Sequence, residues 1–144
     1  MILPLILSDL NRQSFAMELL AALDSGQLVQ AYHMNQSARS LMAAWLWNQT
    51  GKNVLIVSQD DIIAEDIWDD LVAFIGRDKA RYLPDYEILP YEERSPHYSI
   101  RATRMICLQQ SLDPAPAVYS LSIRALTRYL PSRHLLERQV FSLV

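Results

Sequence analysis

The run Asn35–Arg39 holds the position at which this sequence would bind a phosphate group. In many nucleotide-handling proteins, the loop before a crossover helix supplies glycines, a lysine and a serine or threonine to the phosphates. This run contains no glycine, and no lysine follows it. The residues at these five positions are Asn35, Gln36, Ser37, Ala38 and Arg39. The position of this run in the sequence therefore matches that of a phosphate loop, but the residues that would hold a phosphate are missing.

Other reactive side chains do not form a recognisable catalytic set. Asp66, Asp69 and Asp70 follow one another closely, but no histidine or cysteine joins them at metal-ligand spacing, so we interpret them as a solvated helix face. His97 has no neighbouring nucleophile and is interpreted as a helix cap or a surface residue. Cys107, the single cysteine, is interpreted as a small buried hydrophobic residue. We expect no catalytic residue and no metal site.

The charge of the chain argues against strong nucleic-acid binding. The formal net charge is −3 and the isoelectric point is about 5.5, whereas nucleic-acid-binding domains usually carry a basic face. Arginines gather in the C-terminal half, and we interpret them as a solvated surface rather than a surface that tracks phosphates. They are Arg101, Arg104, Arg124, Arg128, Arg133 and Arg138. We therefore expect weak or no direct DNA binding.

The elements around the phosphate position are predicted to alternate between strand and helix. Leu28–Ala31 is predicted to be a short buried strand and Ala38–Gln49 an amphipathic helix, which Gly51 ends as a C-terminal cap. Val54–Val57 is a continuous apolar run, typical of a strand that is buried on both faces of a parallel sheet. Parallel strands need a crossover between them, and the helix supplies it.

Two further helices have clear apolar stripes. The first covers about Arg12–Leu23, with Ser8 or Asn11 as its cap. Its predicted buried stripe consists of Phe15, Leu19 and Leu23. The second begins after Ser58, a good capping residue, and ends near Ile75 before Gly76. Its inward residues are predicted to be Ile63, Ile67, Leu71 and Phe74.

The remaining chain continues the same alternation. Arg81–Leu83 is a predicted strand, Tyr86–His97 an ordered loop, and His97–Ser111 a helix that Ser95 caps with Pro96 at its first position. Later elements follow in the order strand, helix, short helical turn and strand. The strands are Ala117–Ser120 and Val140–Val144. Between them lie a helix over Ile123–Leu130, which Ser122 caps, and a helical turn over His134–Glu137. This order predicts an open α/β domain with a parallel sheet and helices on both faces.

Length and composition suit a packed domain. The chain has 144 residues, of which 51% are hydrophobic and 20% are charged, so we predict one domain over residues 1–144. Because the sequence stops within an apolar strand, we expect it to be a fragment of a longer, multidomain protein. No apolar run approaches the roughly 20 residues of a membrane span. A single cysteine suits the reducing cytoplasm, which is the expected location.

Two stretches give the chain a resemblance to a known family. Val54–Asp60, which follows a helix where a phosphate loop would open, looks like the first domain of UvrB-type proteins. The run Ile88–Tyr91, followed by Ser95-Pro96-His97 and Arg104, resembles the bacterial transcription-repair coupling factors (Mfd). Val118–Ser122 and the following Ala125-Leu126 lie where that family has its next strand and helix. The resemblance covers about Ala16–Val144 and implies a RecA-like, UvrB domain 1a-like fold of the P-loop-NTPase class.

The resemblance also implies a function for the parent protein. Members of this family are ATP-dependent DNA translocases, which displace stalled RNA polymerase and recruit UvrA of nucleotide-excision repair. Their ATP and Mg²⁺ belong to a C-terminal motor, while the N-terminal module has a degenerate nucleotide site. In our alignment Ala38 replaces the phosphate-loop lysine and Arg39 the serine or threonine, so neither can grip the phosphates or Mg²⁺ in the usual way. The resemblance therefore implies a non-catalytic scaffold without a cofactor of its own.

Two alternatives remain open at this stage. In the first, the chain is an active nucleotide-binding helicase domain with an atypical phosphate loop, in which Arg39 takes the place of the lysine. In the second, it is an interaction module from an unrelated α/β family. Nucleotide binding would distinguish the first alternative from the scaffold, and the coding sequence beyond Val144 would distinguish the second.

Overall fold

The computed structural model describes residues 3–86, 88 and 95–139. It contains two compact units, Met1–Arg39 and Ser40–Val144, and each is described by itself. The first unit consists of α1 (Leu3–Asn11), α2 (Ser14–Asp24), a coil, and the first turn of α3 (Gln36–Thr50). The second unit begins within α3 and contains all the strands that the described residues form.

The helix predicted near the start of the chain is present as α2, but its buried stripe was wrong. Phe15 and Leu23 are 41% and 40% exposed, and Ala16 is the buried residue of this helix. The capping prediction was also wrong, because Gln13 precedes the helix and makes no side-chain cap. A repeat of apolar residues indicates a helix face correctly, but burial also requires a partner surface for that face.

The second unit is an α/β fold around a small parallel sheet. Its strands are β1 (Val54–Ser58), β2 (Ala80–Leu83) and β3 (Val118–Ser122), in the spatial order β1-β3-β2. Val118 lies opposite both Val54 and Ala80, so the three strands begin at the same level. β3, the last of the described strands, therefore occupies the centre, with a crossover between each pair of consecutive strands, as parallel pairing requires.

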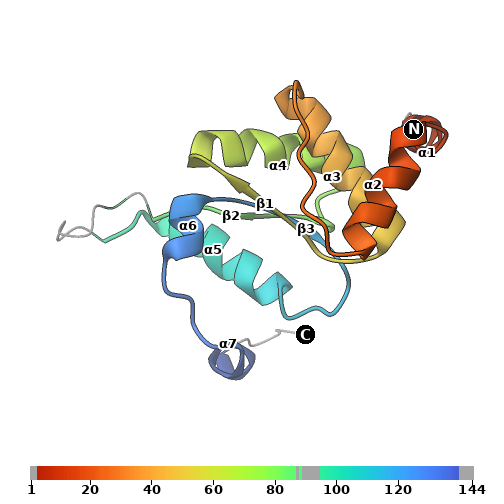
Figure 1. Cartoon of the computed structure of the whole chain (residues 1–144). Coiled ribbons are helices and arrows are strands. Elements are labelled where there is room, and N and C mark those ends of the chain that lie inside the picture. The colour runs from red at the N-terminus through yellow and green to blue at the C-terminus, as the bar shows by residue number, and fades with distance from the viewer. Residues whose placement is uncertain (1–2, 87, 89–94, 140–144) are drawn as a thin grey trace. The chain divides into compact units, whose positions relative to one another are not determined.

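Helices cover both faces of this sheet, as predicted (Figure 1). On one face α3 and α4 (Asp61–Ile75) pack on the strands through a cluster that includes Ala44, Ile67, Leu71 and Val118. On the other face lie α5 (Tyr98–Gln110), α6 (Ile123–Thr127) and α7 (Arg133–Gln139). Their cluster contains Leu83, Cys107, Leu108, Leu121, Ala125 and Leu136. None of the helices in the described ranges is long and apolar enough to cross a membrane.

The predicted ends of α3 and α4 and the predicted cap of α6 agree with the structure, whereas the capping residue of α4 differs. Gly51 and Gly76 end α3 and α4 with positive φ values of 60° and 88°, and Ser122 caps α6 by accepting the N–H of Ala125. Asp60, rather than Ser58, caps α4, because its side chain accepts the N–H of Ile63 at 2.9 Å. Figure 1 shows α4 starting directly beyond β1.

The helix α5 starts later than predicted. His97, rather than Ser95, is its capping residue and accepts the N–H of Ser99. This agrees with the interpretation of His97 as a cap. The helix α6 ends at Thr127 instead of Leu130, because Arg128 has extended backbone angles (φ −77°, ψ 145°). The strand predicted over Val140–Val144 and most of the loop over Tyr86–His97 lie outside the described residues.

The prediction that β1 is buried on both faces was wrong. Leu55 and Val57 are 55% and 43% exposed, whereas Val54 and Ile56 pack against the cluster under α3 and α4. A continuous apolar run predicts two covered faces only for a strand with neighbours on both sides. Since β1 lies at the edge of the sheet, the face that carries Leu55 and Val57 is only partly covered.

Leu71 tests whether the cluster under α3 and α4 carries the stability of the second unit. Its side chain is fully buried, so replacing it with alanine should lower the free energy of unfolding by about 2–5 kcal/mol. The same helix offers Ile62, which is 75% exposed, and Ile62→Ala should change stability by less than about 0.5 kcal/mol. Urea unfolding of both variants measures the difference. Equal effects would show that this cluster is not the core.

Candidate functional site

The run Asn35–Arg39 forms the start of α3, and the side chain of Asn35 caps it. The Asn35 Oδ1 atom accepts the N–H of Ala38 at 2.8 Å, and the Asn35 carbonyl accepts the N–H of Arg39 at 3.1 Å. Asparagine is a favoured residue at this position because its oxygen satisfies N–H groups that the first helical turn leaves open. In a phosphate loop, such N–H groups would face the phosphate.

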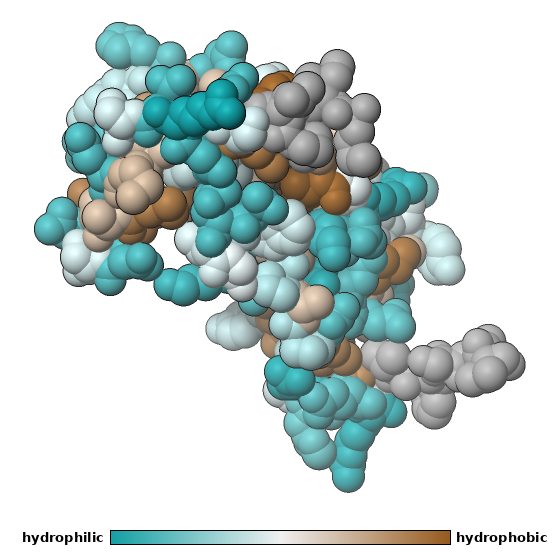
Figure 2. Space-filling view, turned by 90° about the vertical axis from the view of Figure 1, so that its right-hand side faces the viewer, coloured by the Kyte–Doolittle hydropathy of each residue, from teal (hydrophilic) through white to brown (hydrophobic). Residues whose placement is uncertain are grey.

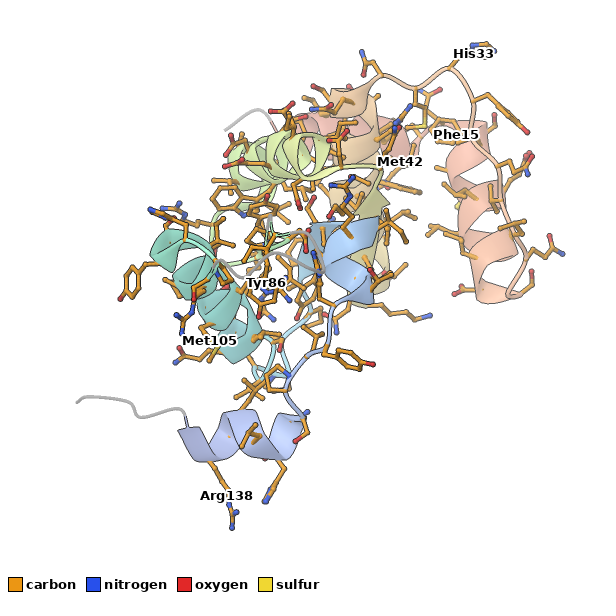
Figure 3. All side chains as sticks on the ribbon, turned by 90° about the vertical axis from the view of Figure 1, so that its left-hand side faces the viewer. Phe15, His33, Met42, Tyr86, Met105 and Arg138 are labelled. Atoms are coloured by element: carbon orange, nitrogen blue, oxygen red, sulfur yellow. The ribbon has the colours of Figure 1, made fainter. Side chains whose placement is uncertain are left out.

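The two residues aligned with the phosphate-gripping positions have other roles in the structure. Ala38 has no polar side-chain atom, and the guanidinium of Arg39 bends back, where Nε donates to the carbonyl of Met34 at 3.2 Å. His33, on the coil before the helix, has a φ of 59°, in the left-handed region that non-glycine residues rarely adopt (Figure 3). The loop therefore turns without a glycine, and the Arg39 side chain bonds to the backbone of the same segment.

The strand predicted in front of this loop is absent. Leu28–Ala31 is a coil, and Leu28 is 90% exposed. A strand of four residues is stable only when a neighbouring strand pairs with it and covers its apolar side chains, and none of the strands described here does so. The run Asn35–Arg39 therefore joins a coil to a helix, and the expected strand–loop–helix unit is only partly formed.

A second polar cluster lies at the carboxyl edge of the sheet, where open α/β folds commonly bind ligands. Asp85, which follows β2, is buried and receives hydrogen bonds at 2.8 and 3.3 Å from Nε and Nη2 of Arg128. Arg128 also donates to the carbonyl of Ile88 at 2.8 Å. At the start of α4, the Asp61 carboxylate accepts the N–H of Asp85 at 3.1 Å. These contacts join β2, α4 and the end of α6.

Electrostatics reinforce the ion pair between Asp85 and Arg128. Burial alone would raise the pKa of Asp85, but the hydrogen bonds from Arg128 and from the Tyr86 backbone, with the charges of Arg128 and Arg104, outweigh it. The net effect lowers the pKa of Asp85, so the carboxylate stays ionised. The hydrogen bond to Asp85 raises the pKa of Arg128 in turn. The pair is therefore satisfied internally and leaves little capacity for a ligand.

Arg104, predicted to lie on a solvated surface, is instead buried at 1% exposure. Its Nη1 atom donates to the carbonyl of Pro84, and its guanidinium lies 4.1 Å from the centre of the Tyr86 ring. The Nε and Nη2 atoms have no partner in the described part of the chain. Of the other arginines of that group, Arg128 is paired with Asp85, while the remaining four are exposed, as predicted. They are Arg101, Arg124, Arg133 and Arg138.

Sequence reasoning missed the Asp85–Arg128 pair because no local pattern marks it. The two residues are 43 positions apart and meet only after β3 has joined the sheet between β1 and β2. Asp85 directly follows a proline, and such a pair is typical of a turn. One general signal was present, since polar residues directly after the strands of a parallel sheet converge at the same edge.

A cavity of 560 Å³ lies between α4, β2 and α5. Its walls combine the rings of Trp68 and Tyr82, which stack with centres 5.8 Å apart, with the charged residues Glu65, Arg77 and Arg81. Arg81 is buried and donates to the Tyr119 hydroxyl at 2.5 Å. The volume suits a small molecule. None of the residues 35–39 lines this cavity, so it is separate from the predicted phosphate position.

Metal-binding chemistry finds no support in the described ranges. No group of three or more histidine, cysteine, aspartate or glutamate side chains is arranged to hold an ion there. Asp66 is exposed, and Asp70 accepts a hydrogen bond from the Ser40 hydroxyl at 3.1 Å. Cys107 is buried as predicted, and burial raises the pKa of its thiol to about 11. A thiol with that pKa is a poor nucleophile at neutral pH.

Comparisons with known proteins gave no match to a protein family, to a curated protein or to a solved structure.

The ion pair of Asp85 gives a pH-dependent prediction. Because the folded-state pKa of Asp85 is lowered, its stabilising contribution is present above the unfolded-state pKa of about 3.9 and is lost as the pH falls through the folded value. At pH 7, Asp85→Asn should therefore lower the free energy of unfolding by about 1–3 kcal/mol. Below about pH 4 the difference between the variant and the original chain should shrink.

The control for this experiment is the exposed pair of Arg133 and Glu137, whose atoms are 2.7 Å apart. Such solvated pairs contribute between 0 and about 1 kcal/mol, so Glu137→Gln should have little effect at either pH. Urea unfolding at pH 7 and at pH 3.5 measures all three proteins. An Asp85→Asn difference that is constant with pH would contradict the assigned role.

Proposed function

We propose that this chain is the non-catalytic, UvrB-like N-terminal domain of a bacterial transcription-repair coupling factor. In that role it serves as a scaffold, of the degenerate P-loop-NTPase class, for other domains of a longer protein. The parent would be an ATP-dependent DNA translocase that displaces stalled RNA polymerase and recruits UvrA. The parent's C-terminal motor, rather than this domain, would use ATP and Mg²⁺.

The sequence pattern around α5 is the main support for the family assignment. It combines Ile88–Tyr91 with Ser95-Pro96-His97 and Arg104. In the structure, the parts of this pattern that are described make internal contacts. His97 caps α5, and Arg104 binds the carbonyl of Pro84 and faces the ring of Tyr86. Residues used in this way hold β2 to α5 and are suited to a structural domain.

The observation that carries the non-catalytic role is the cap at Asn35. Its side chain already accepts an N–H group of the first turn of α3, the part of a phosphate loop that would receive the phosphate. A bound nucleotide would have to displace this oxygen and would gain no lysine in return. The alternative of an active nucleotide site with Arg39 as the gripping residue is disfavoured, because Arg39 donates to the Met34 carbonyl.

The segment Leu28–Ala31 is a coil, which differs from a motor-like domain. A motor-like domain would have a strand there, and the loop at Asn35–Arg39 would join that strand to a helix. The support therefore comes from the parallel sheet, from the pattern around α5 and from the cap at Asn35, and not from a complete strand–loop–helix unit. The interaction module from another α/β family is the competing proposal that this coil favours.

Nucleotide binding tests the scaffold directly. Titration of the chain with ATP and Mg²⁺ should give no saturable heat and no change in the amide spectrum of residues 35–39 up to about 1 mM nucleotide. The variant Ala38→Lys restores the missing lysine but not the glycines, and it should also fail to bind. Binding by the original chain with a millimolar or tighter Kd would contradict the proposal and favour the active domain.

The coding sequence beyond Val144 tests the family. A coupling factor requires a small inserted domain, the rest of the UvrB-like fold, a polymerase-binding segment and a motor with the pattern GxxxxGK[ST] and an acidic box. Sequencing the source DNA downstream should reveal this order. A stop codon within a few residues of Val144 would overturn the assignment and leave an independent α/β module.

A further inference from the structure

The buried cation of Arg81 has no counter-ion among the described residues. Its side chain is only 4% exposed, and the residue lies in the wall of the 560 Å³ cavity between α4, β2 and α5. None of the described carboxylates forms an ion pair with it. Its Nε atom is shielded from solvent and also has no partner in the described part of the chain. A buried charge without a counter-ion is costly, so an anion bound in this cavity would be favoured.

Two contacts hold the Arg81 side chain in place. Arg81 lies opposite Tyr119 in the register of β2 with β3, and its guanidinium lies 5.2 Å from the centre of the Tyr119 ring. The hydrogen bond from Nη1 to the Tyr119 hydroxyl adds a second point of attachment. A guanidinium that is already oriented loses little freedom on binding, and its planar fork matches the two oxygens of a carboxylate.

The other walls of the cavity provide an apolar surface that is also held in place. The indole of Trp68 donates to the Ala80 carbonyl at 3.3 Å and stacks with the ring of Tyr82. From the opposite side, α5 contributes the aliphatic side chains of Ile100 and Ile106. Apolar and aromatic walls with a small number of placed polar groups are typical of pre-formed sites for small molecules.

The charged residues that line the cavity leave an excess of one positive charge. They are the two arginines Arg77 and Arg81 and the single carboxylate Glu65. Arg77 is exposed, and its guanidinium lies 5.3 Å from the centre of the Trp68 ring. Because the net charge of this lining is positive by one, it matches a ligand with one negative charge better than a ligand with two.

We propose that this cavity binds a small carboxylic acid with a cyclic apolar body, and that its carboxylate accepts hydrogen bonds from the Arg81 guanidinium. The ring of the acid lies between the aromatic side chains of α4 and β2 and the aliphatic side chains of α5. This inference depends on the lining of the cavity and not on the proposed function.

Phenylacetate is a suitable probe, because it joins one carboxylate to one apolar ring. Titration of the chain followed by amide NMR should give saturable shifts in β2 and in residues 99–110, with a Kd of about 5 mM or tighter. The neutral analogue phenylacetamide should bind at least about tenfold more weakly, because it supplies no counter-ion. Benzyl phosphate, which carries close to two negative charges, should bind no more tightly than phenylacetate.

A charge placed in the cavity tests the role of the cation without altering the buried arginine. Thr103 is exposed and lines the cavity, so Thr103→Glu adds a competing carboxylate and should weaken phenylacetate binding by about tenfold. The matched control is Met105→Glu on the same helix, since Met105 is 47% exposed and does not line the cavity. This control makes the same change in net charge and should leave the affinity unchanged.

Removal of the cation is the direct test. Arg81→Gln keeps a donor for the Tyr119 hydroxyl but not the charge, and it should abolish the preference for phenylacetate over phenylacetamide. Urea unfolding shows whether this variant folds, and Thr103→Glu decides the question if it does not.

Several results would overturn the proposal. They are the absence of saturable shifts up to about 20 mM phenylacetate, shifts that lie outside the cavity, and equal binding of acid and amide. An unchanged affinity in Thr103→Glu would also overturn it. Tighter binding of benzyl phosphate would overturn the assignment to a carboxylic acid.

Discussion

The position of β3 between its two neighbours is the constraint on which the second unit depends. Because β3 comes last among the described strands and bonds to both β1 and β2, these three strands cannot form one sheet until the chain from α4 to α5 is in place. The central strand is also bound from above, where the buried Ser120 hydroxyl donates to the carbonyl of Ala64 in α4 at 2.6 Å. A buried hydroxyl without such a partner would be costly, so this bond fixes how α4 crosses the sheet.

The contacts beyond the sheet follow from the same arrangement. Once β3 is central, the ends of β2 and β3 lie side by side, and Asp85 meets Arg128 across 43 residues of sequence. The buried Arg104 then fills the space between α5 and the segment after β2 by binding the Pro84 carbonyl. These polar contacts connect β2 to α5 and to the end of α6. They use the carboxylate of Asp85 and part of each guanidinium, while Nε and Nη2 of Arg104 have no partner among the described residues.

The sequence allowed the type of most elements to be predicted, because helix and strand periodicities are local properties. The strands at Val54, Ala80 and Val118 and the caps at Gly51, Gly76 and Ser122 belong to this class. Burial was less predictable, since it depends on what lies above a residue. Phe15 and Leu55 are apolar and exposed, while Arg104 is charged and buried. The coil at Leu28–Ala31 has the same cause, because a strand forms only if the fold provides a neighbour.

For the candidate site, the sequence showed which phosphate-binding residues are absent more readily than which contacts the present residues make. The absence of glycine and lysine at Asn35–Arg39 is visible from residue types alone, whereas the cap made by Asn35 is a matter of geometry. In Figure 2 polar and charged residues cover most of the visible face, and apolar residues show only in small patches. The apolar residues that matter for the edge of β1 were recognisable only from their exposure.

The burial of Cys107 has a practical consequence for studying this chain in solution. With a pKa of about 11, very little of the thiol is ionised at pH 7, and the residue is buried. Maleimide and other alkylating labels react with the thiolate, so they will react only very slowly with Cys107 in the folded state. A single cysteine introduced on the surface can therefore carry a fluorophore or spin probe without replacing the native one. Slow labelling of Cys107 would then report the rate at which the layer beneath α5 opens.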